Sequence, residues 1–241
     1  MLNIVSTSDA RRRGSNRSRR FSTDEVVDAA LRCVERDGLD ALTMRAVATE
    51  LGASPMALYR YVDGREDLVA RTVDRSLAGF DFPDLPAADA PGAELAAWLR
   101  AMAVEGRIRL LRYPGTADHL LLHGPTGPWS ILFMDQVCKV IALTGREPTE
   151  VAWAYDWLMT TAAAYISKEA RLGDGGSKAA VSLQQLAADV AKYPDLIPVV
   201  ATFTGVVGDS YTRATNLVID ALTADPSPPG PASAGRSAPP A

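Results

Sequence analysis

Residues 39–68, LDALTMRAVATELGASPMALYRYVDGREDL, carry the pattern of two short helices that meet at a glycine. Thr43 is a suitable N-cap for the first helix, because its hydroxyl oxygen can accept a backbone N–H of the first turn. Gly52 ends that helix, since glycine enters the left-handed conformation at no steric cost. Ser54 and Pro55 then supply an N-cap and a first helical residue for the second helix. The segment is therefore predicted to be a helix-turn-helix.

Apolar residues at helical spacing divide this motif into a core side and an outer side. On the first helix the core positions are Val47, Ala48 and Leu51. On the second helix they are Leu58, Tyr59 and Val62. The positions that remain on the outer side are Arg45, Pro55, Met56, Ala57, Arg60 and Tyr61.

A capped helix precedes the motif. Ser22 and Glu25 have the spacing of a capping box, and Gly38 closes the helix that they open. The apolar stripe of this helix is Val26, Val27, Ala30, Leu31 and Val34. Three helices within about fifty residues bury only a small core, so the bundle is expected to pack against the next part of the chain. Residues 63–80, DGREDLVARTVDRSLAGF, are predicted to contain a fourth helix that couples the bundle to the C-terminal residues.

This order of elements resembles the DNA-binding domain of the tetracycline-repressor (TetR) family of bacterial transcription regulators. The resemblance covers residues 21–68 and rests on the capped first helix, on LTMRAVATELGASPMALYRYV and on GREDL. Members of the family are usually all-α homodimers whose variable C-terminal domain binds a small effector. The resemblance implies an all-α protein with an N-terminal three-helix DNA-binding domain and a larger helical domain for ligand binding and dimerisation.

The resemblance also implies roles for individual residues, because the second helix of the family's motif enters the major groove of DNA. Thr43 would hold a phosphate, and Arg45 matches a position that reaches a base edge. The chain departs from the family pattern in placing Pro55 one position early, which leaves the register of Pro55 and Met56 on the bases open. The full set of expected DNA contacts is Thr43, Arg45, Ser54, Pro55, Met56, Ala57, Arg60, Tyr61 and Arg65.

The charge of the chain is unevenly distributed. The formal net charge is −4, but residues 1–80 carry 13 Arg and 12 acidic side chains, while residues 81–241 carry 12 basic and 17 acidic ones. Six of the arginines lie before the first helix, at Arg11, Arg12, Arg13, Arg17, Arg19 and Arg20. Residues 1–20 are therefore predicted to be a disordered basic arm, either one that reaches phosphates or a minor groove, or a solvated tail that aids solubility.

Residues 69–224 are predicted to form the second, helical domain, because no convincing strand pattern occurs in them. A linker rich in Asp, Pro and Ala at 81–92 leads into its longer helices. Helices are expected at 93–113, 116–123, 129–144, 148–172, 178–192 and 209–223, with a turn at 193–198. Residues 225–241 are rich in Pro, Ala and Ser and are predicted to be a disordered tail.

Two helices of this domain carry small or apolar residues three or four positions apart. They are Val151, Leu158, Ala162, Tyr165 and Ile166 in one helix, and Tyr211, Ala214, Leu217, Val218 and Ala221 in the other. Small residues let helices approach closely, so a four-helix interface across a two-fold axis is expected around 162–164 and 214–221. Packing within one domain is the alternative, and the family resemblance favours the homodimer.

Aromatic and Met residues in the second domain indicate a pocket for an apolar or aromatic effector. Trp153 and Trp157 share one helix face, and a few polar groups are available to orient a ligand. The same stripe is also compatible with plain core. The predicted lining is Trp98, Met102, His119, His123, Trp129, Phe133, Met134, Trp153, Asp156, Trp157 and Thr160.

No cofactor or metal is expected. His119 and His123 are spaced to share one metal ion, but no further ligand completes the site. The sequence has no nucleophile elbow, phosphate loop, zinc-protease helix or dinucleotide fingerprint, and the two cysteines, Cys33 and Cys138, indicate no disulfide framework. The sequence shows neither a signal peptide nor a long apolar span, so a cytoplasmic protein without membrane contact is expected.

These observations together predict a DNA-binding transcriptional regulator and no enzyme. The expected protein is a repressor that binds a palindromic double-stranded DNA operator as a homodimer and is released by a small effector, and activation of transcription is the alternative to repression. The alternative is a helical small-molecule-binding protein or enzyme that retains a vestigial DNA-binding domain.

Overall fold

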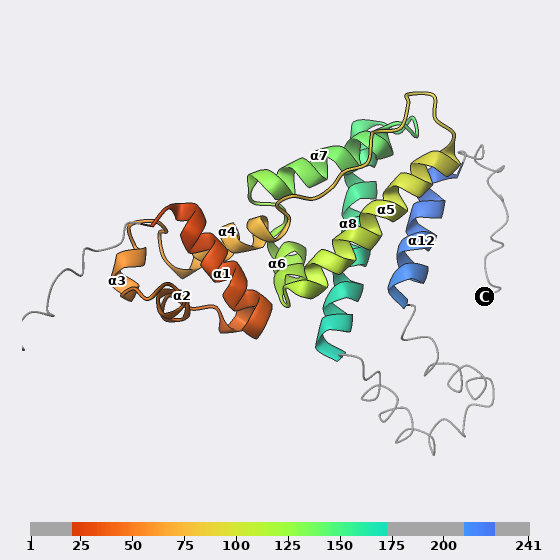
Figure 1. Cartoon of the computed structure of the whole chain (residues 1–241). Helices are drawn as coiled ribbons and strands as arrows, with labels where there is room; N and C mark the ends of the chain where they lie inside the picture. Colours follow the sequence, from red (N-terminus) through yellow and green to blue (C-terminus); the bar gives the residue numbers. More distant parts are fainter. Residues whose placement is uncertain (1–20, 173–209, 225–241) are drawn as a thin grey trace, which may run out of the picture.

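The computed structural model describes residues 21–172 and 210–224, and every regular element among them is a helix (Figure 1). The predicted all-α class is confirmed for this part of the chain. The predicted arm at 1–20, the helix at 178–192, the turn at 193–198 and the tail at 225–241 lie outside the described residues. None of the described helices combines the length and apolarity needed to cross a bilayer.

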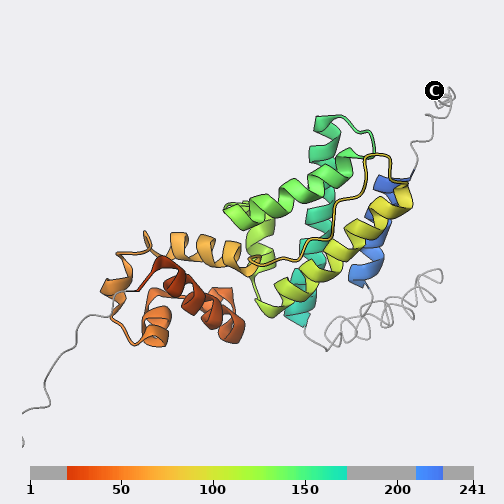
Figure 2. The same cartoon turned by 45° about the horizontal axis from the view of Figure 1, so that its top comes forward.

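The N-terminal helices form one end of the molecule in both Figure 1 and Figure 2. They are α1 (Thr23–Asp37), a 3₁₀ turn η1 (Leu39–Ala41), α2 (Met44–Leu51), α3 (Pro55–Leu58) and α4 (Arg65–Ser76). The predicted capping box opens α1, because Ser22 Oγ accepts from the Glu25 N–H at 3.1 Å while Glu25 Oε2 accepts from the Ser22 N–H at 2.8 Å. The second body consists of α5 (Gly92–Arg112), α6 (Thr116–His123), α7 (Pro128–Ala142), α8 (Pro148–Leu172) and α12 (Ser210–Thr223).

Each end of the molecule has a hydrophobic core of its own. The first core joins α1, α2, α3 and α4 through fully buried residues such as Val34, Val47 and Leu68. The second core joins α5, α7, α8 and α12, and Leu99 and Ile219 are buried within it. The segment between α4 and α5 covers this second core with Phe80 and Phe82, which pack against Phe133 of α7.

The core position predicted for Tyr59 was wrong. Tyr59 was expected to face the core, but its side chain is 54% exposed. The reason is that α3 ends at Leu58, so the 3.6-residue period no longer applies to the next position. Leu58 and Val62 are buried as expected.

The turn between α5 and α6 holds the N-terminal bundle against the second body. The Leu39 N–H donates to the Pro114 carbonyl at 2.8 Å, and the Tyr113 ring is buried among the residues of the first core. Arg112 adds an exposed ion pair to Glu35 of α1 at 2.9 Å. The adjacent Gly115 has φ +90°, and a Cβ at this position would lie 2.8 Å from Leu39 Cβ.

Gly115→Ala is expected to lower the free energy of unfolding by about 2–4 kcal/mol, because a left-handed alanine and an overpacked contact with Leu39 are both unfavourable. Gly79→Ala is the matched control, since Gly79 also has positive φ (+67°) but open space around its Cβ position. The control is expected to cost about 1–2 kcal/mol from the backbone alone. Urea unfolding of both variants measures the difference, and equal losses would contradict a tight contact at Leu39.

Candidate nucleic-acid interface and internal cavity

The helix-turn-helix has the caps that the sequence predicts. Thr43 Oγ1 accepts from the Ala46 N–H at 3.1 Å at the start of α2, which leaves the hydroxyl proton of this exposed residue available to an external acceptor. Gly52 ends α2 in the left-handed conformation with φ 63°. Ser54 stands at the N-cap of α3 without a capping side-chain bond, and its hydroxyl forms no hydrogen bond within residues 21–172 and 210–224. An exposed hydroxyl group therefore stands at the N-terminus of each of the two helices of the motif.

The outer side of the motif carries cations that the rest of the described chain does not neutralise. Arg45 on α2 and Arg60 after α3 are exposed and form no ion pair with any described residue. Met56 on α3 is 75% exposed, and Pro55 beside it is exposed too. Free guanidinium groups beside an apolar tip suit hydrogen bonds to guanine and contacts with thymine methyl groups.

Three other predicted contact residues are more constrained. Tyr61 is half-buried, its hydroxyl accepts from the Phe21 N–H at 3.1 Å, and the two rings pack edge to face. Arg65 at the start of α4 donates through Nε to the Leu42 carbonyl at 2.9 Å. Ala57 is partly buried against the motif. Tyr61 and Arg65 are thus each held by one hydrogen bond within the bundle.

A charged network supports α2 from behind. Glu50 of α2 pairs with Arg32 at 2.9 Å and with Arg36 at 3.3 Å, and both arginines lie on α1. Hydrogen bonds from Arg32 and then Arg36 lower the pKa of the Glu50 carboxyl group. These arginines are therefore committed within the bundle, in contrast to Arg45 and Arg60.

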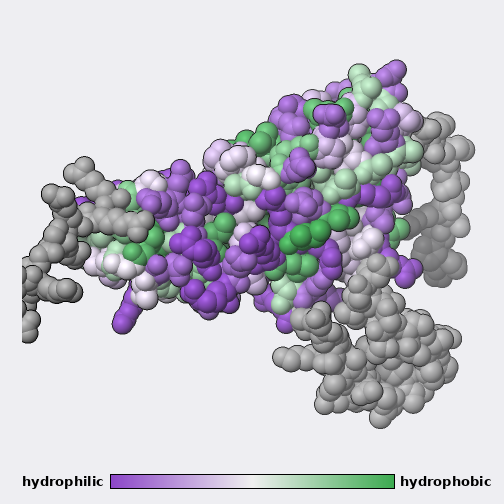
Figure 3. Space-filling view, in the orientation of Figure 1, coloured by the Kyte–Doolittle hydropathy of each residue, from purple (hydrophilic) through white to green (hydrophobic). Residues whose placement is uncertain are grey.

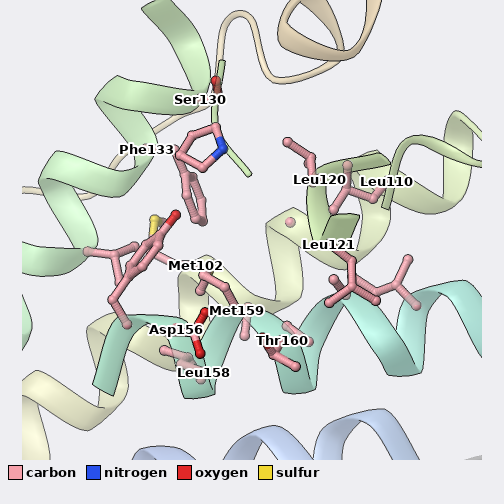
Figure 4. Close-up of a pocket in the computed structure, with 18 of the residues that line it drawn as sticks. Met102, Leu110, Leu120, Leu121, Ser130, Phe133, Asp156, Leu158, Met159 and Thr160 are labelled. Carbon is pink, nitrogen blue, oxygen red and sulfur yellow. The ribbon is translucent and has the colours of Figure 1, made fainter. Parts of the chain in front are cut away.

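The second body contains an apolar cavity of about 180 Å³, bounded by α4, α5, α6, α7, α8 and α12 (Figure 4). Phe133 of α7 faces Leu120 and Leu121 of α6 across it, and Met159 approaches from α8 (Figure 4). Most of the wall is Leu, Met, Ala and aromatic carbon. Such a wall suits an apolar or aromatic ligand.

A few polar groups interrupt this wall. Asp156 and Thr160 lie one turn apart on α8, and neither Asp156 nor Tyr155 makes a hydrogen bond to the described part of the chain. Burial raises the pKa of Tyr155 above its usual range, so its phenol remains a donor. Ser130 and Tyr211 also line the cavity, but their hydroxyl groups already bond to other protein atoms. The uncommitted groups are therefore concentrated on α8.

The cavity brings together four of the residues predicted from the sequence, namely Met102, Phe133, Asp156 and Thr160. The others lie elsewhere. Trp98 is buried in the second core, and its indole N–H donates to the Pro83 carbonyl at 3.3 Å. The predicted residues that do not belong to the cavity wall are Trp129, Met134, Trp153, Trp157, His119 and His123. The residues that the sequence pattern missed are mainly aliphatic, and single Leu residues carry no signal that separates a cavity wall from core.

His119 and His123 stack on each other with ring centroids 4.3 Å apart. Burial and the neighbouring His123 lower the pKa of His119, so this imidazole is mainly neutral at neutral pH. Among residues 21–172 and 210–224, no group of three or more His, Cys, Asp or Glu residues is arranged to hold a metal ion.

The structure buries part of each stripe that the sequence analysis places at the dimer interface. The residues of the predicted stripes that are buried within the second body are Val151, Leu158, Ile166, Tyr211 and Val218, so they are unavailable to a partner. Ala164, Leu217 and Ala221 of the predicted interface are exposed, so these positions remain accessible to a partner. The exposed large apolar residues on these two contacting helices are Trp153 (65% exposed), Trp157 (39%) and Leu217 (72%).

Comparisons with known proteins agree with this arrangement. Residues 26–72 match the family of bacterial regulatory proteins, tetR family. The chain is 33% identical over 134 residues to the HTH-type transcriptional repressor DrrR1 of Streptomyces coeruleorubidus, covering 56% of this chain and 48% of that protein. It is 35% identical over 102 residues to the class D tetracycline repressor protein of Escherichia coli, covering 42% and 45%. The chain thus spans less than half the length of these two curated relatives.

A solved structure extends the comparison to the second body. The TetR family protein ActR of Streptomyces coelicolor, in complex with (S)-DNPA, superposes with a TM-score of 0.73 at 22% identity, over 86% of this chain and 98% of that one. At this identity the likeness concerns the fold. Residues 26–72 thus form a helix-turn-helix domain that matches the TetR family of bacterial regulatory proteins, and the chain as a whole shares its fold with a solved TetR family protein.

Proposed function

We propose that this protein is a ligand-responsive transcriptional repressor that binds a palindromic operator as a homodimer in the cytoplasm and is released by a small apolar or aromatic effector. The observation that carries the proposal is the presence of two features in one chain. A helix-turn-helix presents Arg45 and Arg60, which form no ion pair with a described carboxylate, and an apolar cavity reaches Leu77 at the end of α4. The helix that leaves the DNA-binding bundle therefore leads directly into the cavity wall.

DNA binding is supported by the outer surface of the motif. In this arrangement α3 enters the major groove, and Arg45 and Arg60 approach base edges or phosphates beside it. Thr43 donates its free hydroxyl proton to a phosphate at the N-terminus of α2, where the backbone N–H groups also favour an anion. Tyr61 and Arg65 fix the orientation of the bundle on the DNA backbone.

The test begins with a duplex selected from a random library by the full-length protein, with affinities measured by fluorescence anisotropy. Arg45→Ala is expected to reduce discrimination between this duplex and one with an altered half-site by about 1–3 kcal/mol, because a bidentate contact to guanine is lost. Thr43→Ala is expected to weaken both duplexes alike, since a phosphate contact carries no sequence information. Arg171→Ala is the control, because Arg171 is 71% exposed at the far end of α8.

An equal loss on both duplexes for Arg45→Ala would contradict its role in reading bases. Failure of the wild-type chain to enrich any duplex would contradict the proposed function as a whole. That result would favour a helical ligand-binding protein with an inactive DNA-binding domain.

Effector binding is supported by the cavity and its uncommitted polar groups. An aromatic ring system fits against Phe133, Met102 and Met159, and a single polar substituent reaches Asp156 or Thr160. Occupation of the cavity changes the position of α4, and with it the spacing of the two recognition helices in a dimer. The effector then shifts the population toward a conformation that no longer fits the operator.

Ala163→Phe is expected to weaken binding of the fluorescent probe 1-aminoanthracene by about tenfold or more, because the added ring occupies the cavity that the probe needs. Ala163 is only 9% exposed and forms part of the wall. Ala170→Phe, at a position further along α8 and outside the cavity wall, is the matched control and is expected to leave probe affinity unchanged. Probe fluorescence measures both, and unchanged affinity in Ala163→Phe would place the ligand site elsewhere.

The homodimer is supported by the exposed apolar surface of α8 and α12. Trp153, Trp157 and Leu217 lie on two helices that contact each other. Aromatic and aliphatic side chains exposed to this degree are typical of interface cores. We place the two-fold axis next to these three residues.

A further inference from the structure

We propose that Asp74 of α4 acts as a detachable N-cap for α7, and that this clamp transmits the state of the cavity to the spacing of the DNA-binding domains. The inference rests on the proposed function, because it describes how the effector cavity and the DNA-binding bundle communicate. It concerns one carboxylate and the helix end that it holds.

The first turn of α7 receives no cap from its own N-cap side chain. The N-cap is Gly127, which has no side chain, and the first residue is Pro128, which has no N–H. The N–H groups of Trp129 and Ser130 therefore need an acceptor from elsewhere. That acceptor comes from more than fifty positions earlier in the sequence.

Asp74 supplies the acceptor from a buried position, with only 7% of the residue exposed. Its Oδ1 accepts from the Ser130 N–H at 2.8 Å, and its Oδ2 lies 3.4 Å from the Trp129 nitrogen. The Ser130 hydroxyl lies 2.9 Å from the same Oδ1. A carboxylate at a helix N-terminus is also favoured by the helix dipole.

The Asp74 carboxylate fits at this helix end because residue 127 is a glycine and has no side chain. A Cβ on Gly127 would lie 2.2 Å from Asp74 Cγ and 2.5 Å from each carboxylate oxygen. The backbone of Gly127 is extended, with φ −133° and ψ 174°, so no positive φ calls for glycine here. The close approach of α4 is the reason that a side chain is excluded.

The clamp lies on the boundary of the cavity. Ser130 lines the cavity while it bonds to Asp74, and Phe133 lines it one turn further along α7 (Figure 4). Leu77, three residues after Asp74, forms another part of the same wall. A ligand that displaces Phe133 or Leu77 therefore moves α7 and α4 relative to each other, and the buried carboxylate either follows or loses its partners.

The clamp fixes α4, and α4 carries the helix-turn-helix. With Asp74 engaged, the DNA-binding bundle holds one orientation, and a dimer fits only one half-site spacing. Without it, α4 is attached to the second body by fewer contacts, and the two bundles tolerate several spacings. The proposal therefore predicts a property that a loss of stability alone does not change, namely the dependence of DNA affinity on half-site spacing.

The experiment compares Asp74→Ala with the double variant Asp74→Ala/Gly127→Ser. The serine supplies a cap for α7 from its own N-cap position, where its extended backbone is suitable, and shortening the side chain at position 74 removes the steric conflict. The double variant thus restores the end of α7 without restoring the link to α4. Asp135→Asn, which changes an exposed acidic residue of the same helix, is the control for charge.

Two measurements are made on the full chain. Hydrogen exchange of peptides covering 128–133 is expected to be several-fold faster in Asp74→Ala and to return to the wild-type rate in the double variant. Affinity is measured for the library-selected duplex with its half-site spacing changed by one base pair. The wild type and Asp135→Asn are expected to lose about tenfold or more, while both Asp74 variants lose less than about threefold.

A wild-type spacing profile in the double variant would overturn the proposal, because Asp74 would then only stabilise α7. An unchanged profile or unchanged exchange in Asp74→Ala would overturn it as well. If the wild type selects no duplex, the proposed function and the role of the clamp in DNA spacing both fail. The exchange measurement alone then still decides whether Asp74 holds α7.

Discussion

Replacing both Trp153 and Leu217 by Arg is expected to produce folded monomers and to weaken binding to a palindromic duplex by about two to four orders of magnitude. Both side chains are largely exposed in the single chain, at 65% and 72%, so arginine at these positions leaves the domain core intact. In the proposed dimer they are buried against the partner, where unpaired arginines are strongly unfavourable. Without the dimer, each subunit binds its half-site independently, and the gain in affinity from binding both half-sites at once is lost.

Sedimentation equilibrium measures the oligomeric state, and anisotropy measures the affinity. The matched control is Val104→Arg/Ile108→Arg, which changes two apolar residues of α5 that are 56% and 57% exposed. Figure 3 shows a hydrophobic patch over the middle of this helix. If the Trp153/Leu217 variant remains a dimer and the control becomes a monomer, the dimer interface lies on α5 and not on α8 and α12.

Raising the salt concentration from 50 to 200 mM is expected to reduce DNA affinity by about a thousandfold, if the dimer makes about six phosphate contacts. The reason is counterion release, since each phosphate neutralised by a cation frees condensed ions from the DNA. Arg65→Ala is expected to make the logarithmic slope shallower by about two, because each of the two subunits loses one cationic phosphate contact. Thr43→Ala removes a neutral contact and is expected to leave the slope unchanged.

Anisotropy titrations at four or five salt concentrations give these slopes directly. Arg171→Ala serves as the control, because its side chain lies on α8 and pairs with Asp118 at 3.0 Å. An affinity that is independent of salt concentration would contradict DNA binding that depends mainly on contacts with phosphates. An unchanged slope in Arg65→Ala would remove Arg65 from the DNA backbone.

The DNA-binding motif was predictable because its signals are local. Thr43 and Gly52 act on atoms within a few residues of themselves, and the structure places both at the helix ends expected of them. The same local reasoning failed at Tyr59, where α3 had already ended. Short helices are sensitive to this error, because one residue decides whether a side chain still follows the helical period.

The cavity and the clamp depend on contacts that no local pattern reveals. The contact between Asp74 and Ser130 joins residues 56 positions apart, and nothing in the sequence near Asp74 distinguishes it from the other acids of the same helix. Periodicity located the apolar stripes of α8, but a stripe looks the same whether it faces its own core or a partner. The same ambiguity applies to Trp153. It was predicted to line the pocket, and its side chain is 65% exposed.

The contact between Phe21 and Tyr61 constrains Tyr61 from inside the bundle. The Phe21 N–H donates to the Tyr61 hydroxyl at 3.1 Å and the two rings pack edge to face, so the chain just before α1 is held beside the residues that follow α3. The hydroxyl accepts in this bond, which leaves its proton available to a DNA phosphate. In the proposed complex, a DNA contact at Tyr61 therefore also stabilises the start of α1, because both contacts depend on the position of one ring.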